Sequence, residues 1–235
     1  MTAFARRFFS RPTALFGFAI FVAILVIALA APLIFARGPF TIVGMPLLPP
    51  GSPGLPVGSD VLGRNMAAGL AFGARISLLV GVTSTLGAIG LGVLLGAVAG
   101  YYGGAVDDLL MRVTEFFQII PTFVLLMVLV AFMEPSLASA VIGIALISWP
   151  QVARVVRGEF LSLRQREFVQ AARVLGLSDT AIIFTQILPN ALSPIVVISS
   201  MMVGNAILTE SALSFLGLGD PNLRSEERRV GKECW

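Results

Sequence analysis

Apolar residues gather in five runs along the 235-residue chain, each near the length of about 20 residues that crosses a membrane as a helix. The runs cover residues 14–35, 76–99, 119–133, 137–156 and 191–216. The third is short for a membrane span unless it includes part of the preceding "LLMRVTEFFQ". The first is longer than the apolar core of a signal peptide, so it is expected to remain as an anchor. This pattern predicts an all-α fold, a polytopic membrane helical bundle with five spans.

The arginines predict the orientation, because positively charged loops stay on the cytoplasmic side. One group precedes the first span and another follows the fourth: Arg6, Arg7 and Arg11, then Arg154, Arg157, Arg164, Arg166 and Arg173. Both groups fall inside if the N-terminus is cytoplasmic. The loop 37–75 then lies outside, where its proline and glycine content predicts a plain connector.

Five spans that start inside end outside, which places the last residues, "RSEERRVGKECW", against the charge rule. Residues 1–223 contain no lysine, whereas this tail holds Lys232 and Cys234, the only lysine and the only cysteine of the chain. We therefore expect residues 224–235 to be a non-native tail and exclude them from the fold.

Composition agrees with a membrane protein and excludes several functions. Hydrophobic residues make up 57% of the chain and charged residues 12%, and the mean hydropathy is +0.93. A net charge of +3 is scattered among apolar runs and forms no basic face for nucleic acid. Without histidine and with one cysteine, the chain offers neither a His/Cys metal site nor histidine catalysis. We expect no catalytic residue, metal or cofactor.

A segment that contains residues typical of helix ends and helix starts separates the fourth and fifth spans. Its apolar residues fall at i, i+3, i+4 and i+7, one face of a helix: Phe168, Ala171, Ala172 and Leu175. Gly176 stands where a left-handed residue ends a helix, Ser178 can cap a second helix, and Pro189 marks the start of the fifth span. A membrane-surface helix and a solvated loop are alternatives. The two alanines, which let another backbone approach closely, favour a protein partner.

The same segment carries a resemblance to a known family. "QAARVLGLSDTAIIFTQILP" is similar to the EAA loop of ABC importer permeases, with matches at Ala171, Ala172, Gly176, Leu188 and Pro189 and departures at Gln170 and Gln186. "PVGSDVLGRNMAAGLAFGARISLLVG" and "ESALSFLGLG" resemble the C-type permease subunit of the dipeptide, oligopeptide and nickel importers. Asn65 stands where the family usually has aspartate.

The resemblance implies a type I ABC importer transmembrane domain in a bacterial or archaeal plasma (inner) membrane. Residues 1–73 would hold the cytoplasmic stub, first span and outer loop, and 74–223 the domain, with the EAA loop at about 157–189. A sixth span would be missing after "LSFLGLG". Implied partners are a second homologous permease, two cytoplasmic ATPases, an extracytoplasmic substrate-binding protein and membrane lipid. The substrate would be a peptide or nickel.

In that family the EAA loop forms the coupling helix, held in a groove of the ATPase. The residues that would serve this coupling are Phe168, Gln170, Ala171, Ala172, Leu175, Gly176, Ser178 and Pro189. The chain has no G-x-x-x-x-G-K-[ST] motif, so ATP hydrolysis is expected on another chain, and this subunit is not expected to be an enzyme.

Several residues within or between the spans raise further expectations. Glu210 is ionisable inside the fifth span and is a candidate for the translocation pathway; the alternative is that it lies near the outer interface or bonds the partner permease. Glycines 87, 90, 92, 96 and 100 predict close helix packing, while Pro121 and Pro150 predict a kink or a helix start. The charges between spans two and three are expected to form a solvated cytoplasmic turn, with a second contact with the ATPases as the alternative: Asp107, Asp108, Arg112 and Glu115.

Two other classes of protein fit the sequence less well. An ion-coupled secondary transporter or channel would place several charges at mid-membrane and show repeated halves, whereas here only Glu210 lies within a span. An intramembrane enzyme would need a base or nucleophile that the spans do not offer. A non-enzymatic transport subunit is therefore the preferred interpretation.

Overall fold

The computed structural model describes residues 10–219, and in this range the chain forms helices joined by loops, with isolated bridges but no extended strand. The chain divides into two compact units, residues 1–78 and 79–235, with the boundary inside one long helix. Arg6, Arg7 and the predicted non-native tail lie outside the described residues. Within the described range, the all-α prediction is confirmed.

The first unit contains α2 (Pro12–Ile34), a long loop and the first part of α3 (Met66–Tyr102). The loop is irregular but held by its own polar groups. The Ser59 hydroxyl donates to the Met45 carbonyl at 2.7 Å and accepts from the Leu48 amide at 2.9 Å. Residues 37–65 therefore form an irregular loop held by its own hydrogen bonds, and the rest of the range expected to be a loop, 66–75, is the start of α3.

The start of α3 is fixed by a side-chain cap. The Asn65 side-chain oxygen Oδ1 accepts from the Ala67 amide at 3.0 Å, which satisfies a donor that the first turn of a helix leaves free. Asparagine and aspartate are equally good caps, so the departure at Asn65 preserves the local structure. The helix begins at Met66, ahead of the predicted start at residue 76.

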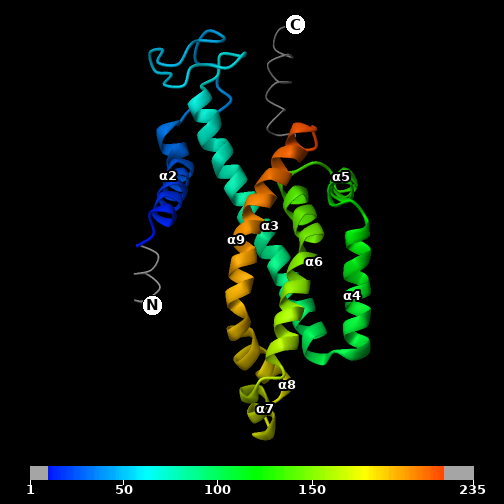
Figure 1. Ribbon diagram of the computed structural model, residues 1–235. Coiled ribbons are helices and arrows are strands. Elements are labelled where there is room, and N and C mark those ends of the chain that lie inside the picture. The colour runs from blue at the N-terminus through cyan, green and yellow to red at the C-terminus, as the bar shows by residue number, and fades with distance from the viewer. Residues whose placement is uncertain (1–9, 220–235) are drawn as a thin grey trace. The chain divides into compact units, whose positions relative to one another are not determined.

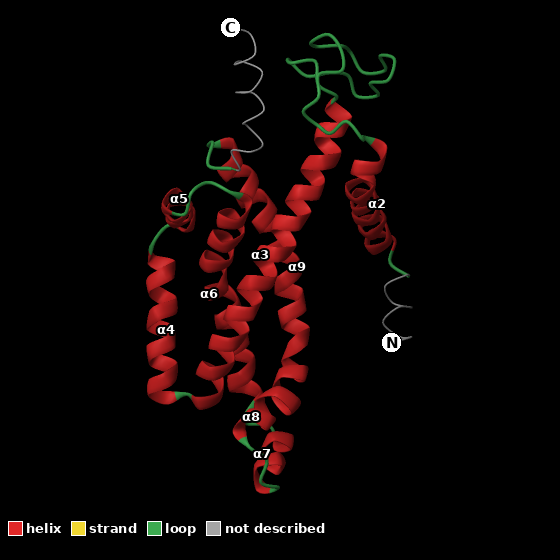
Figure 2. Ribbon diagram, turned by 180° about the vertical axis from the view of Figure 1, so that it is seen from behind, coloured by secondary structure: helices red, strands yellow, loops and turns green. Residues whose placement is uncertain are grey.

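The second unit holds the remaining helices. They are α4 (Gly104–Ile119), α5 (Thr122–Phe132), α6 (Leu137–Leu163), α7 (Glu167–Val174), α8 (Asp179–Ala181), the π-helix η1 (Ile182–Ile187) and α9 (Leu188–Phe215). Figures 1 and 2 show α6 and α9 side by side, with α7 and α8 at the end of these helices that lies away from α5.

The described residues contain four helices long and apolar enough to cross a membrane, or five if one bent pair counts as a span. The four are Pro12–Ile34, Met66–Tyr102, Leu137–Leu163 and the continuous Asp179–Phe215. The predicted third span, 119–133, is instead the bent pair, because α4 and α5 meet at 88°. Pro121 caps α5 and lacks a backbone donor, and the preceding Ile120 is extended, as residues before proline usually are.

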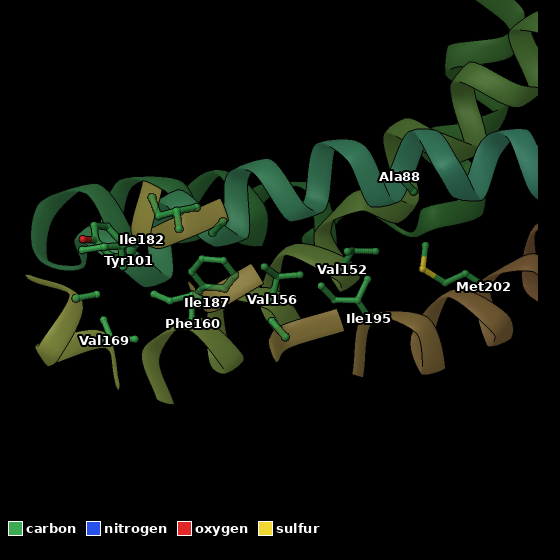
Figure 3. Close-up of a cluster of buried hydrophobic side chains, with 14 residues drawn as sticks. Ala88, Tyr101, Val152, Val156, Phe160, Val169, Ile182, Ile187, Ile195 and Met202 are labelled. Atoms are coloured by element: carbon green, nitrogen blue, oxygen red, sulfur yellow. The ribbon is translucent and has the colours of Figure 1, made fainter. Parts of the chain in front are cut away.

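The core of the second unit gathers side chains from α3, α6, α7, η1 and α9 (Figure 3). Its members are Ala88, Ala97, Tyr101, Val152, Val156, Phe160, Val169, Ala172, Ile182, Ile183, Ile187, Ala191, Ile195 and Met202. The short helix α7 and the π-helix thus belong to the same core as the long helices, which fixes them to the bundle.

Glycines let α3 lie directly on α6. A Cβ atom added at Gly92 would overlap Val152, one at Gly96 would overlap the Ala153 carbonyl, and one at Gly100 would lie 2.6 Å from the Phe160 Cβ. The close packing predicted for this stripe is confirmed at these three positions. Gly90 differs, since nothing lies within 4 Å of a Cβ added there.

Candidate functional site

The segment between α6 and α9 folds as helix, turn and helix, as Gly176 and Ser178 predict. α7 runs from Glu167 to Val174, and Gly176 follows with a φ of +79°. The Leu177 amide donates to the Ala172 carbonyl at 3.1 Å, and the Gly176 amide to the Arg173 carbonyl at 3.0 Å. This pair of bonds is a Schellman motif, which requires a left-handed residue that glycine adopts without strain.

The second helix begins at the predicted cap and then widens. The Ser178 hydroxyl accepts from the Ala181 amide at 3.4 Å, and α8 passes into the π-helix η1, in which the Leu188 amide donates to Ile183. Pro189 occupies the first turn of α9. Proline has no amide hydrogen and cannot donate a backbone hydrogen bond within a helix. Pro189 lies where the π-helix passes into α9.

Residues 168–175 of this segment carry two apolar faces rather than one. Val169 is fully buried and Ala172 is 5% exposed, and both belong to the core. Val174 and Leu175 are 88% and 79% exposed, and Phe168 and Ala171 are also exposed. The four-residue face expected from the sequence is therefore wrong at Ala172, which is turned into the chain's own core.

Polar contacts join this segment to the last turn of α3. The Tyr101 hydroxyl donates to Asp179 Oδ1 at 2.5 Å, and the Arg173 guanidinium carbon lies 5.3 Å from the centre of the Tyr101 ring. Arg164 Nη1 donates to the Gly100 and Tyr101 carbonyls at 3.2 and 3.1 Å, the position where a helix favours a cation. These contacts link residues far apart in sequence, and no local pattern indicated them.

The charged residues between spans two and three are solvent-exposed as expected at Asp108, Arg112 and Glu115, but they form no turn. They lie on a helix, and Asp107 is buried, with both carboxylate oxygens accepting from Arg157: Oδ1 from Nε and Oδ2 from Nη2 at 2.6 Å. Planar two-point contacts of this kind fix geometry as well as charge. A cavity of about 590 Å³ beside the pair is lined in part by Asp108, Arg112, Glu115 and Arg154.

Glu210, the ionisable residue of the fifth span, is buried on α9, and its Oε1 accepts from the Ser214 hydroxyl at 2.8 Å. A second cavity, of about 290 Å³, lies between α6, α9 and the start of α5. Glu210 does not line it, whereas the polar side chains of Gln151 and Asn205 do. These two amides carry no charge, so the ionisable residues within the spans, the signal that singled out Glu210, do not point to them.

Comparison with known proteins agrees with this architecture. Residues 92–231 match the family described as binding-protein-dependent transport system inner membrane component. Residues 2–50 match the N-terminal transmembrane domain of oligopeptide transport permease C. A solved structure of the MetNI methionine ABC transporter is similar in fold, with a TM-score of 0.55, 18% identity, and coverage of 62% of this chain and 73% of that chain.

Curated relatives are more similar in sequence. The dipeptide transport system permease protein DppC of Alkalihalophilus pseudofirmus is 43% identical over 162 residues, 69% of this chain and 53% of the relative. The glutathione transport system permease protein GsiD of Pectobacterium atrosepticum is 41% identical over 163 residues, 69% and 54%. The oligopeptide transport system permease protein OppC of Bacillus subtilis is 33% identical over 216 residues, 92% and 70%. The chain thus spans about half the length of the first two relatives.

The fold and these likenesses define a polytopic, all-helical plasma-membrane protein built like the transmembrane domain of a type I ABC importer. The chain belongs to the family of binding-protein-dependent transport system inner membrane components, the ABC importer permeases, and within it to the C-type subunits.

Proposed function

We propose that the chain is a permease subunit of an ATP-driven importer for peptides and that it forms half of the translocation pathway together with a second, homologous permease. Family membership supports the transport role, and the relatives above are named for dipeptides, oligopeptides and glutathione. These names support peptides over nickel, the other substrate that the sequence leaves open. An extracytoplasmic binding protein would deliver the peptide, and two ATPase chains would hydrolyse ATP.

The observation that carries the coupling role is the uncovered apolar face of α7. Phe168, Ala171 and Leu175 are exposed, and Val174 beside them is 88% exposed. Exposed apolar groups gathered on one short helix mark an interaction site. Such a helix suits a groove on a partner protein, and the partner proposed here is the ATPase.

The other residues of the segment would hold this face in place and connect it to the helical bundle. Val169 and Ala172 pack into the core, so a displacement of α7 would reach η1 directly and α6 and α9 through the side chains of that core. Gly176 and Ser178 set the angle between α7 and α8, and Pro189 sets the start of α9. Gln170, at the first position of the EAA motif, is exposed and donates to the Arg164 carbonyl at 3.3 Å.

The proposed orientation puts the N-terminus and α7 in the cytoplasm, as the arginine distribution indicates. A reporter that is active only in the cytoplasm should be active when fused after Arg173. The same reporter should be silent when inserted near Gly51. The reverse pattern would overturn this orientation.

The coupling role is tested by placing a charge on the exposed face of α7. Leu175→Arg leaves the core intact because Leu175 is 79% exposed. An unpaired charge forced into a packed interface costs several kcal/mol, about 10²-fold or more in affinity. We expect the variant to reach the membrane and pair with the second permease but to lose the ATPases on co-purification, together with ATP-dependent uptake of a radiolabelled dipeptide in proteoliposomes.

The matched control is Gln165→Arg, which adds the same side chain at an exposed polar position just before α7. It should retain ATPase binding and uptake. Wild-type levels of both in Leu175→Arg would refute the coupling role. Failure of the wild-type complex to take up the dipeptide with ATP and the binding protein would refute the transport proposal itself.

A further inference from the structure

A small polar cavity lies within the membrane-spanning part of the second unit. Its volume is about 290 Å³, just below the range of about 300–1,000 Å³ typical of ligand sites. Polar residues come from three helices, and the lining is Thr122, Ile147, Ser148, Gln151, Met202, Asn205, Ala206, Leu208 and Thr209. No charged side chain lines this cavity among the residues described.

Two side-chain amides define its character. Gln151 lies fourteen residues from the start of α6 and twelve from its end, about 21 and 18 Å along the axis at 1.5 Å per residue. Asn205 lies ten residues, about 15 Å, before the end of α9 at Phe215. Gln151 thus lies inside the predicted fourth span, five residues before its cytoplasmic end at residue 156, and Asn205 lies near the middle of the predicted fifth span, 191–216.

Neither amide is satisfied by the chain itself. Gln151 and Asn205 are exposed, and within residues 10–219 neither side chain has a hydrogen-bond partner. Thr209, by contrast, donates to the Asn205 backbone carbonyl at 2.8 Å. Polar groups left without partners in lipid are costly, and for that reason such residues face a bundle interior or a water-filled path. We therefore expect the face that carries Gln151 and Asn205 to be turned away from lipid.

We propose that this cavity is a subsite of the translocation pathway that hydrogen-bonds the main-chain amides of a peptide in transit. The inference rests on the proposed function and adds the chemistry of recognition. A side-chain amide both donates and accepts, as each peptide unit of a substrate does. A divalent cation such as nickel would require carboxylate, imidazole or thiolate ligands, none of which lines the cavity.

This chemistry gives a pathway that is indifferent to substrate side chains. Main-chain groups are the same in every peptide, and hydroxyl groups from Ser148 and Thr122 add further adaptable donors and acceptors. The absence of a fixed charge also avoids trapping a charged side chain, which a passage site must release. Glu210, whose carboxylate is held by Ser214, stays outside this subsite.

The first test removes each amide at nearly constant volume. Gln151→Leu and Asn205→Leu are introduced into the full complex, with Gln118→Leu as control because Gln118 is exposed on α4 and lines neither cavity. The loss of one hydrogen bond is expected to reduce uptake of radiolabelled dialanine about tenfold. Assembly with the partner permease and ATPases should be unchanged, and the control should behave as wild type.

A chemical comparison sharpens the result. N-methylation of the peptide bond of dialanine removes its donor, so the wild-type complex should import the methylated form less well. The ratio between the two substrates should move toward one in Gln151→Leu and Asn205→Leu, because the binding protein and its own preference are the same throughout. Unchanged uptake and an unchanged ratio in both variants would overturn the proposal.

Accessibility provides an independent readout. In a Cys234→Ser background, which removes the only cysteine of the chain, Asn205→Cys should react with a membrane-impermeant thiol reagent, and saturating dialanine should slow the reaction. No labelling would indicate a lipid-facing residue. Loss of assembly in the leucine variants would indicate a contact with the partner permease. Either result overturns the subsite, whereas loss of wild-type uptake would overturn the transport role on which it rests.

Discussion

Adding one methyl group to α3 by a glycine-to-alanine substitution should destabilise the bundle at Gly96 but not at Gly90. Gly96→Ala places a Cβ atom against the Ala153 carbonyl, with the Ala153 Cα at 3.0 Å and the Val156 Cβ at 2.9 Å. Two of these atoms belong to the backbone of α6, so rotation of a side chain cannot relieve the overlap. The two helices must separate.

The magnitude follows from two opposing effects. Overpacking of this kind costs about 1–3 kcal/mol, while replacing glycine by alanine inside a helix returns up to about 1 kcal/mol. Gly96→Ala should therefore destabilise the protein by about 1–2 kcal/mol in net terms. Gly90→Ala meets nothing within 4 Å and should be neutral or stabilising by up to about 1 kcal/mol.

The measurement is the thermal midpoint of the purified permease pair in detergent. The loss of the monodisperse peak on heating serves as the signal. For a protein of this size, 1 kcal/mol corresponds to about 2–4 °C. Gly96→Ala should melt about 2–8 °C below wild type, and Gly90→Ala at or slightly above it. Equal midpoints for the two variants would refute the close contact between α3 and α6.

Three further variants test polar contacts. Asp107→Leu should lower the thermal midpoint by several degrees, because it leaves the partly buried Arg157 unpaired, and Asp107→Leu combined with Arg157→Met should recover most of the loss; no recovery would refute the pairing. Tyr101→Phe removes the donor to Asp179, worth about 1–1.5 kcal/mol, and should raise the ATP hydrolysed per peptide imported without affecting assembly; an unchanged ratio would mean that this bond does not transmit motion. Glu210→Gln should reduce uptake while assembly survives if Glu210 lines the pathway, and normal uptake would leave it as a structural partner of Ser214.

Local chemistry made parts of the fold predictable from the sequence. Gly176 and Ser178 ended and started helices where expected, because caps depend on the dihedral angles and side-chain oxygens of a few neighbouring residues. The glycine stripe at 92, 96 and 100 predicted close packing, because glycines on an apolar helix let the backbone of a neighbouring helix approach closely. Neither inference required knowledge of a distant residue.

Features that depend on distant contacts were not predictable in this way. Val169 and Ala172 face the core while Phe168 and Leu175 do not, yet all four are apolar, and the sequence alone does not say which apolar face the chain covers itself. The buried pair of Asp107 with Arg157 joins residues fifty positions apart. A carboxylate in a polar cluster resembles a solvated turn until its partner on another helix is known.

The π-helix η1 has a consequence for the spacing of apolar residues. Ile183, Ile187, Ala191 and Ile195 all belong to the core, and they recur every four residues. In a regular helix of 3.6 residues per turn, twelve residues at that spacing would drift by about 120° around the axis. The wider π turns offset part of this drift and keep the four side chains on one side. The period of four that runs across Pro189 therefore accompanies a widened helix in this chain, and a projection at 3.6 residues per turn would place these side chains on different sides of the helix.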